Sequence, residues 1–597
     1  MHIAFRFHYI HDNGLFGRLL QEVGKHSRLP LNLYQEKHEY VLAASGDQPE
    51  LEALADLVST YVPQSLFLQG YTLTEYGTPH EPQLLAETKT HYQVPCCPQC
   101  QQKITQTLDP FEPCFVCGFN DTLLTLEDLR TFTQTDTLSA EELFITLAEK
   151  LIAEESITLP TYNGIRRFSL LQCEEAKESG ILICDPVHIS ASWLITQGEL
   201  DALMTIEKPS VRLKPKLKFR AEFDLTKPFY PVFFADDKVT LALSTALLRK
   251  GVEAVYCNHP PLLRVASALK HPVIVTAGRD MLPWHHPMLL TQASCCSFEG
   301  FEASGGQNGL VVDTVAKPVT SGCVRFVAKG EPSSSPHPIF FEPSHAVLRS
   351  IVLEHGLQGQ SLCGIYLSRT HRSQICSFSA KIGYTPMADF SDVSLASPKR
   401  MLTSISRMDE AGARLIANYQ KVFPKQFEKI EQARFEGEGD ASMLIRLWAM
   451  AALFIGLCDG DSIQNGCEQL EATALEFNGK SGPRIDYKVL KSENGYQIDP
   501  RLAIRSAMSF KLAGVDEYLL SYGFIDSLAD FIAQQAELAD ANISIEGVTL
   551  GGSLFENRQL LRCTYNALSP NYPVFHNERL SMDGANVAVG AVSLGSE

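Results

Sequence analysis

The clearest chemical signal in the sequence is a set of four cysteines arranged as two close pairs. Cys97 and Cys100 form the first pair, Cys114 and Cys117 form the second, and 13 residues separate the pairs. A structural zinc ion is held tetrahedrally by four such thiolates, and two Cys-x-x-Cys turns supply them. The spacing therefore predicts a structural zinc site and disfavours the alternative of four unrelated thiols. A closed set of four ligands leaves no open position for catalysis.

A second candidate site lies near the C-terminus, in the segment VTLGGSLFENRQLL. Gly551 and Gly552 separate a predicted strand from a predicted helix, and Asn557 follows in the same segment. Such a turn can leave backbone N–H groups free for a phosphate, although a tight strand-to-helix connection is the plainer interpretation. Asp583, in SMDGANVAVGA, is interpreted either as a helix N-cap or as a carboxylate of a nucleotide or metal site. These four residues are the predicted contacts for ATP and Mg²⁺.

Two further groups of polar residues are candidates for a functional site. The basic stretch Lys208–Arg220 is either a solvated strand face or a patch that faces a phosphate, and the first interpretation is favoured. His285 and His286 are adjacent, so they do not share a helix face, and no metal-binding histidine spacing occurs near them. Neither group defines a catalytic centre.

The composition is that of an ordinary water-soluble protein with several domains. The chain has 597 residues, 45% hydrophobic and 20% charged, which is too long for one hydrophobic core. Its formal net charge of -18 argues against broad binding to nucleic acid, which requires a basic surface. We therefore expect no nucleic-acid partner.

The N-terminal residues MHIAFRFHYIHDNGLF do not have the pattern of a secretory signal. No apolar window approaches the length of a membrane span, so we expect no membrane association. The 16 cysteines are then better explained as reduced thiols and metal ligands than as disulfides. These points together predict a cytoplasmic location.

Periodicity predicts an α/β chain whose elements place these residues. Residues 1 to about 80 show a β-α-β-β-α-β order in which HEYVLAASG is the second strand and the third strand is unclear, and Asp47 is the predicted N-cap of the second helix. Strand and helix patterns alternate from Leu123 to about Gly330. The segment EPSSSPHP, residues 331–338, is the best candidate for a linker. A strongly helical stretch, DASMLIRLWAMAALFIGLCDG, and the two C-terminal segments quoted above follow it.

These pieces resemble the HypF-type hydrogenase-maturation carbamoyltransferase family. VTLGGSLFENRQLL is similar to the family's Ser-Gly-Gly-Val-Phe-Gln-Asn-Arg segment, and SMDGANVAVGA to its Asn-Asp-Gly-Gly-Ile-Ala-Leu-Gly. LWAMAALFIGLCDGDSIQNGCEQLEATAL resembles the helices upstream of both. EKPSVRLKP and HPPLLRVASALKHPVIVTAGRD resemble the corresponding parts of the YrdC-like domain.

The resemblance implies four segments with a multidomain α/β fold. They are an acylphosphatase-like α+β domain at 1–85, a zinc-binding segment at 86–122, a YrdC-like domain at 123–330 and a carbamoyltransferase-like domain of the actin-like ATPase (ASKHA) type at 331–597. In the family, ATP and carbamoyl phosphate give a carbamoyl adenylate, and the carbamoyl group passes to a cysteine of the partner HypE. The zinc-binding segment is interpreted as a structural link that holds the first domain to the YrdC-like domain.

The chain also departs from the family pattern. It has one set of paired cysteines where the family has two, no glycine-rich loop before Arg6, and Glu174 and Glu175 where cations would be expected. The paired histidines and the Asp-Gly-Thr loop of the last domain have no evident counterpart. Two interpretations of function follow, and the sequence does not decide whether the chain is an enzyme. The chain is either a divergent carbamoyltransferase acting around Gly551, Gly552, Asn557 and Asp583, or a non-catalytic scaffold or regulator that binds a HypE-like partner or a hydrogenase precursor.

The cysteine spacing generates a prediction about metal content. The purified chain should hold one zinc ion, bound by Cys97, Cys100, Cys114 and Cys117. Cys114→Ser should loosen the surrounding segment and leave the C-terminal domain folded, because metal binding contributes to folding near the site. Metal analysis of chelator-free protein measures the zinc content, and a result of no zinc would contradict the prediction.

Overall fold

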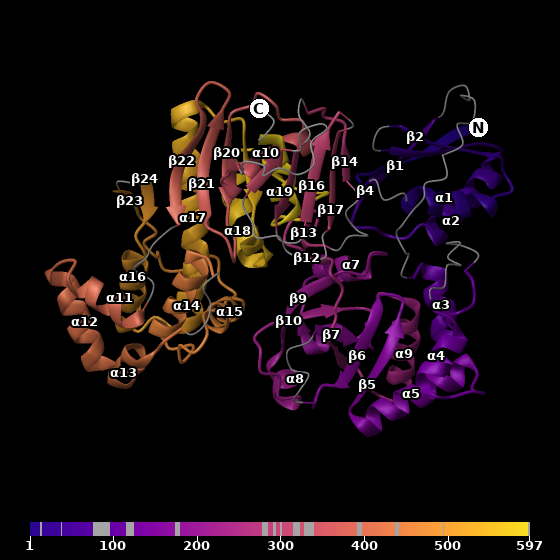
Figure 1. Ribbon diagram of the computed structural model, residues 1–597, viewed down its shortest axis with the longest axis horizontal. Coiled ribbons are helices and arrows are strands. Elements are labelled where there is room, and N and C mark those ends of the chain that lie inside the picture. Colours follow the sequence, from indigo (N-terminus) through magenta and orange to yellow (C-terminus); the bar gives the residue numbers. More distant parts are fainter. Residues whose placement is uncertain are drawn as a thin grey trace. The chain divides into compact units, whose positions relative to one another are not determined.

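The chain folds into two units, Met1–Trp284 and His285–Glu597, each with its own sheets and helices (Figure 1). The predicted multidomain α/β class is confirmed. The computed structural model describes residues 1–11, 15–36, 39–75, 96–114, 124–173, 180–277, 284–290, 294–298, 301–307, 309–314, 323–326, 339–390, 397–435, 441–492 and 495–594. Glu174, Glu175 and the predicted linker at 331–338 lie outside these residues.

The first unit begins with a four-stranded antiparallel sheet in the order β2-β3-β1-β4. Its elements are β1 (His2–Tyr9), α1 (Leu15–Lys25), β2 (Leu31–Glu36), β3 (Glu39–Ser45), α2 (Gln48–Tyr61) and β4 (Leu68–Glu75). The predicted β-α-β-β-α-β order is confirmed, and β2 is the strand that the sequence pattern did not reveal. Asp47 caps α2 as predicted, because its side chain and that of Glu50 form a reciprocal capping box.

A nine-stranded mixed sheet forms the larger part of the first unit, with β13-β12-β9-β10-β7-β11-β6-β5 in order and β8 beside β9. The segment begins with α3 (Pro98–Thr107), α4 (Leu126–Thr133) and α5 (Ala140–Glu154), and continues through β5 (Ser156–Thr161), β6 (Gly164–Leu170), β7 (Gly180–Ile183), α6 (Ile189–Ser192), β8 (Trp193–Leu194), α7 (Gln197–Met204), β9 (Ser210–Pro215), α8 (Leu217–Glu222), β10 (Tyr230–Phe233), α9 (Lys238–Arg249), β11 (Ala254–Cys257), β12 (Arg264–Ala266) and β13 (Val273–Thr276). The strands are short and mostly buried, so their side chains form the core.

A buried carboxylate joins the two sheets of the first unit. Glu207, beside β9, accepts hydrogen bonds from the Ser65 hydroxyl and from the N–H of Leu66 at 3.0 Å. The N–H of Ile206 also donates to the carbonyl of Gln64 at 2.9 Å. Burial raises the pKa of the Glu207 carboxyl despite these bonds. The first lobe is therefore attached to the larger sheet by specific polar contacts.

A six-stranded sheet in the order β14-β17-β16-β15-β18-β19 begins the second unit. Its strands are β14 (Trp284–His286), β15 (Ser294–Phe298), β16 (Phe301–Gly306), β17 (Gly309–Thr314), β18 (Cys323–Phe326) and β19 (Ile339–Phe340). Because β18 hydrogen-bonds to β19, strands on both sides of residue 330 belong to one sheet. The two units consequently divide at His285, and not near residue 330, where the sequence pattern places a boundary.

A seven-stranded sheet and its helices complete the second unit, with strand order β23-β24-β22-β21-β20-β25-β26. The elements are α10 (Pro343–His355), β20 (Leu362–Tyr366), β21 (Ser373–Ser379), β22 (Gly383–Phe390), α11 (Pro398–Ser406), α12 (Glu410–Val422), α13 (Pro424–Gln432), α14 (Met443–Ile455), α15 (Ile463–Ala474), β23 (Val489–Ser492), β24 (Gly495–Ile498), α16 (Pro500–Leu512), α17 (Glu517–Ile543), β25 (Gly547–Gly551), the 3₁₀ helix η4 (Ser553–Glu556), α18 (Arg558–Leu568), β26 (Val574–His576) and α19 (Ala585–Leu594).

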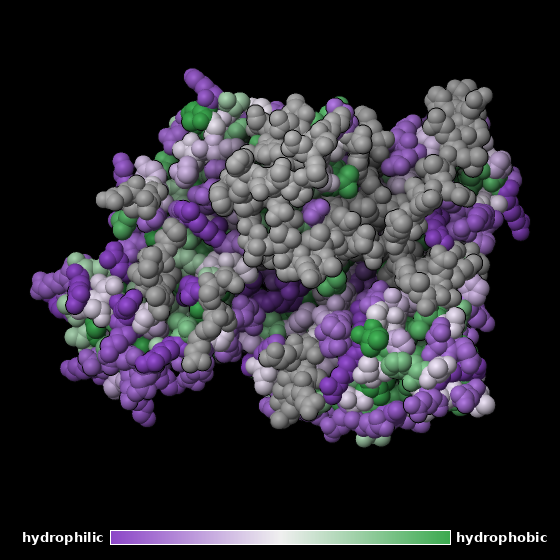
Figure 2. All heavy atoms as spheres, in the orientation of Figure 1, coloured by the Kyte–Doolittle hydropathy of each residue, from purple (hydrophilic) through white to green (hydrophobic). Residues whose placement is uncertain are grey.

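Two helices illustrate how sequence sets the packing of this unit. In α14 all residues except Arg446 are buried, as expected for a helix that is apolar on every side. Helix α19 packs against α10 and the strands β15 and β16, and a Cβ at Gly590 would lie 1.7 Å from the carbonyl oxygen of Ala346. Only glycine allows this approach of the two backbones. By contrast, α12 and α13 present a hydrophilic surface (Figure 2).

Candidate functional site

The predicted metal centre lies at the start of α3. Cys97 is the N-cap of this helix, and its Sγ is 3.6 Å from that of Cys100 and 3.5 Å from that of Cys114. A tetrahedral zinc ion with Zn–S bonds of about 2.3 Å separates its sulfur ligands by about 3.8 Å. A disulfide would instead need a separation of about 2.05 Å. The three thiols therefore fit a zinc ion.

The structure brings together three of the four predicted metal ligands. Cys117, the fourth, lies outside the described residues, so the complete four-thiol set stays a prediction. Within the part of the chain that the structure describes, this is the one cluster of three or more histidine, cysteine or acidic groups with ligand atoms close enough for one ion. The buried thiol of Cys96 lies next to it in the sequence.

The second predicted site gathers around Asp583. Its Oδ1 accepts a hydrogen bond from the Tyr366 hydroxyl at 2.7 Å. Its Oδ2 accepts bonds from the Ser368 hydroxyl at 2.6 Å, the Ser553 hydroxyl at 2.6 Å and the Ser553 N–H at 3.0 Å. Asp583 thus joins the end of β20, the turn after β25 and the segment before α19. Both of its oxygens accept hydrogen bonds within the chain, and its role as a Mg²⁺ ligand stays a prediction.

The turn after β25 does not leave backbone N–H groups free for a phosphate. The N–H of Gly552 donates to the carbonyl of Met582 at 2.8 Å, and that of Leu554 to Leu367 at 2.9 Å. Ser553 donates to Asp583, and Phe555 donates to the carbonyl of Gly552 at 3.3 Å. The expected cradle of free amides is therefore wrong, because the turn folds against β20 and bonds to it.

The two glycines and Asn557 have structural reasons for their identity. Gly552 has φ of +105°, and a Cβ there would lie 2.1 Å from the carbonyl oxygen of Leu367. A Cβ at Gly551 would lie 2.2 Å from Cγ1 of Val347. Asn557 caps α18, because its Oδ1 accepts bonds from the N–H groups of Gln559 and Leu560, both at 3.0 Å. The structure brings the glycines and Asp583 together and gives Asn557 a separate role.

A buried arginine next to this turn was not found from the sequence. Arg369, between β20 and β21, donates from Nη2 to Glu471 at 2.7 Å and lies 3.6 Å from Glu556. Its side chain is 10% exposed. Burial alone would lower the pKa of the guanidinium, but the charges of the two glutamates raise it above its ordinary value. The guanidinium is thus buried, and two of the chain's own carboxylates neutralise its charge.

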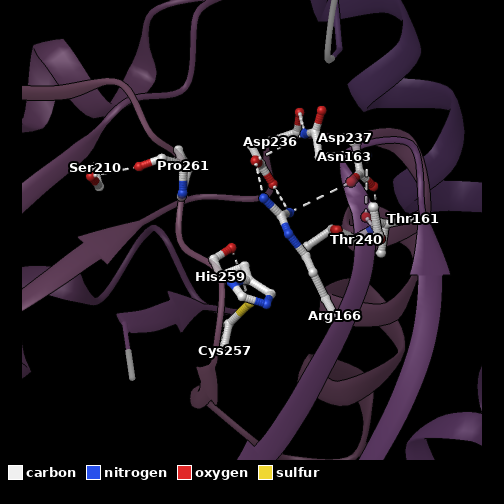
Figure 3. A network of polar contacts seen from close by, with 11 residues as sticks. Thr161, Asn163, Arg166, Ser210, Asp236, Asp237, Thr240, Cys257, His259 and Pro261 are labelled. Carbon is white, nitrogen blue, oxygen red and sulfur yellow. Dashed lines mark hydrogen bonds and ion pairs between the residues drawn. The ribbon is translucent and has the colours of Figure 1, made fainter. Parts of the chain in front are cut away.

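The first unit contains a similar cluster (Figure 3). Arg166, on β6, donates from Nη1 and Nη2 to the two oxygens of Asp236 at 2.5 and 2.7 Å, and its Nη1 lies 3.6 Å from Asp237. Asn163 from the β5–β6 turn also donates to Asp236 at 3.0 Å. Burial lowers the pKa of Arg166, but the charge of Asp236 and their hydrogen bonds outweigh it, so the pKa is raised. All three charged side chains are buried.

The favoured description of the basic stretch Lys208–Arg220, as a solvated strand face, is wrong. β9 is largely buried and so is not a solvated face. Three of the cations bond backbone carbonyls: Lys208 donates to Met204 at 3.1 Å, Lys216 to Ser190 at 2.5 Å, and Arg220 to Leu225 at 3.0 Å. These charges therefore hold loops and helix ends in place.

Arg6 belongs to a strand and pairs with acidic side chains. It lies in the middle of β1, so no loop precedes it, and its Nη1 lies 3.0 Å from both Glu36 and Glu39. The hydrogen bond to Glu36 raises the pKa of Arg6. The guanidinium is again matched by two carboxylates of the chain.

Comparison with known proteins shows which families and solved structures this chain resembles. Residues 380–591 match the family model described as the second subdomain of a carbamoyltransferase, Kae1-like domain. The protein HydE of Wolinella succinogenes is 26% identical over 443 residues, which are 72% of this chain and 73% of HydE. A full-length HypF, solved in a phosphate- and nucleotide-bound form, superimposes with a TM-score of 0.61 at 13% identity, covering 100% of this chain and 98% of that one. The HypF of T. kodakarensis superimposes with a TM-score of 0.60 at 12% identity and the same coverage.

The class of protein is thus a multidomain α/β protein with the fold of HypF, in which residues 380–591 are similar to the second subdomain of a carbamoyltransferase, Kae1-like domain. The resemblance to the HypF-type carbamoyltransferase family is confirmed by these matches. Among the described helices, none is long and apolar enough to cross a membrane.

The packing of Gly552 predicts that substitutions there act on stability. Gly552→Ala should destabilise the second unit by about 3 kcal/mol or more, because a Cβ would meet the Leu367 backbone and the positive φ adds strain. Gly383→Ala is the matched control, since Gly383 also has a positive φ but no heavy atom near the added Cβ, so it should cost only about 1 kcal/mol. Denaturant unfolding of the variants tests the difference. Equal stability of the two variants would contradict the packing argument.

The Arg166 cluster generates a second prediction. Arg166→Met should destabilise the first unit by about 3–5 kcal/mol, because it leaves Asp236 and Asp237 buried without their cation. Arg6→Met, at a pair that water reaches, should cost about 0–1 kcal/mol. Hydrogen exchange at the amides of β6 and β11 measures both effects. Adding Asp236→Leu to Arg166→Met should recover part of the lost protection, and failure to recover any would argue against an electrostatic cause.

Proposed function

We propose that this chain acts in nickel–iron hydrogenase maturation as a HypF-like scaffold, and that it does not itself transfer carbamoyl groups. The observation that carries the proposal is the bonding of Asp583. Tyr366, Ser368 and Ser553 direct three hydroxyls and one N–H at its two oxygens. These donors hold the carboxylate within the chain and compete with a Mg²⁺ ion for its oxygens.

The neutralised arginines support the same proposal. Phosphoryl and adenylate chemistry depends on cations and oriented amides aimed at the developing charge. In the described residues, Arg6 and Arg369 each face two carboxylates, and the N–H groups of the turn after β25 are bonded within the chain. Polar groups arranged in this way stabilise the fold and offer little to a phosphate.

The second candidate function is ATP-dependent carbamoyl transfer from carbamoyl phosphate to a partner cysteine. The match of residues 380–591 to a carbamoyltransferase model favours it, as does the nucleotide-bound form of a HypF with the same fold. In this case ATP and Mg²⁺ would be the cofactors, with the site around Gly551, Gly552, Asn557 and Asp583. Opening that site would require Asp583 to give up its bonds to the serines.

The partner proposed under either function is a HypE-like maturation protein or a hydrogenase precursor. The cytoplasmic location and the absence of nucleic-acid and membrane partners remain part of this proposal. So does the zinc ion, which would be structural in both cases, because a closed set of four thiolates leaves no open position for catalysis.

The proposal predicts no turnover. Purified protein given ATP, Mg²⁺, carbamoyl phosphate and a HypE-like protein should release no AMP and should leave the partner's cysteine unmodified, while binding the partner in a calorimetric titration. A full-length HypF under the same conditions is the control. A carbamoylated partner in the mass spectrum would overturn the scaffold proposal. Failure to bind both the HypE-like protein and a hydrogenase precursor would overturn it as well.

A further inference from the structure

The helices α11, α12 and α13 form a basic part of a strongly acidic chain. The whole chain has 51 basic and 69 acidic residues, but from Pro398 to Gln432 there are seven lysines and arginines and only four acidic residues. The three helices pack against one another and against α14 and α16 (Figure 1). Their basic side chains therefore lie within one small region of the second unit.

All seven of these cations are exposed. Lys429 forms an ion pair with Asp459, which lies beyond α13. The other six define what we call the basic helical surface: Lys399, Arg400, Arg407, Arg414, Lys421 and Lys425.

Most cations of the basic helical surface lack a carboxylate partner. Among the residues that the structure describes, only Arg414 of the six forms an ion pair, with Glu410 at 3.6 Å. The carboxylate of Asp409 is used elsewhere, because it caps α12 and pairs with Arg505 of α16 at 2.8 Å. The surface thus carries a local positive charge that the neighbouring acidic side chains do not balance.

The stability of the helices does not account for this arrangement. On a solvated helix, acidic and basic side chains at i and i+4 attract each other, and like charges repel. Arg414 and Lys421 are seven residues apart on α12, so they share a face, and no acidic residue lies between them in the sequence. Negative charge from outside the helices would relieve the repulsion among the cations.

The composition of the surface favours a protein partner over a polyphosphate. Val422 lies among the cations in the sequence and is 55% exposed. Ala413 and Ala417 are exposed as well. Nucleic acid requires a broad basic surface, and the formal net charge of -18 repels a polyanion at long range. A protein segment with a few carboxylates instead matches the local charge and can also contact the apolar side chains.

We propose that the basic helical surface binds an acidic segment of the partner protein. The inference rests on the proposed function, because it names the surface of this chain that contacts the HypE-like protein or the hydrogenase precursor. Complementary charge of this kind speeds association and selects the partner, and dissolved salt screens it. Binding should therefore weaken as the ionic strength rises.

The test is a calorimetric titration of full-length variants with the HypE-like protein and with a hydrogenase precursor. The triple variant Arg407→Glu, Lys421→Glu, Lys425→Glu should bind its partner about tenfold more weakly at about 50 mM salt, and the loss should shrink at about 500 mM. The corresponding triple change to Gln should give a smaller loss, because it removes the charges without reversing them. All three positions are exposed, so circular dichroism of the variants should be unchanged.

The matched control is Lys218→Glu, Lys270→Glu, Lys381→Glu. These three lysines are exposed, lie outside α11–α13 and alter the net charge of the chain by the same amount. The control should keep its affinity for the partner within about twofold, because charges beyond a Debye length are screened. Equal losses in the control and in the triple Glu variant would indicate a general effect of net charge and would overturn the inference.

The outcomes separate the inference from the function on which it rests. If the unchanged chain binds neither partner at either salt concentration, the proposed function and the inference both fail. If it binds a partner and the triple Glu variant binds equally well, the proposed function stands and the inference is wrong. Duplex DNA, vesicles of anionic lipid and self-association are measured in parallel. Loss of any of these in the triple Glu variant, with partner binding unchanged, would assign the surface to that other ligand and overturn the inference.

Discussion

Two arginines lie deep in the protein, one in each unit, and each is held by a pair of acidic side chains. Arg166 meets Asp236 and Asp237, and Arg369 meets Glu471 and Glu556. A buried charge without a partner is strongly unfavourable, so these contacts fix the segments that carry them. The β5–β6 turn and the start of α9 depend on the first cluster, and the β20–β21 turn and η4 depend on the second.

The same constraint bears on function. Near Arg369, the β20–β21 turn contacts the turn after β25, and Asp583 bonds both. Under the proposed scaffold function, polar groups that a nucleotide-dependent enzyme would direct toward its substrate are directed toward one another. The fold remains that of HypF, since the sheets and helices depend on apolar packing, which tolerates such changes at polar positions. A shared fold and a changed site are therefore compatible.

The predicted zinc-binding segment, residues 86–122, contacts a part of the first unit outside its own cysteine motif. Four cysteines at this spacing could form an isolated knuckle. Here α3 packs against α9, and Arg249 at the end of α9 donates to the carbonyls of Thr105 and Gln106 at the end of α3. Asp237, the N-cap of α9, also faces Arg166. The zinc-binding segment and the buried arginine cluster therefore both contact α9. Metal binding and the stability of the first unit are expected to depend on each other for this reason.

The sequence alone determined the features that depend on near neighbours. The β-α-β-β-α-β order, the capping role of Asp47 and the approach of Cys97, Cys100 and Cys114 follow from periodicity and short spacings. The family resemblance also came from contiguous segments. The tertiary structure decided the rest. The N–H groups of Gly552 and Leu554 bond to the carbonyls of Met582 and Leu367, which lie in other segments of the chain, and Arg369 bonds to Glu471, 102 residues further on. Such partners depend on how sheets and helices pack, and nothing in the local pattern around either residue records that packing.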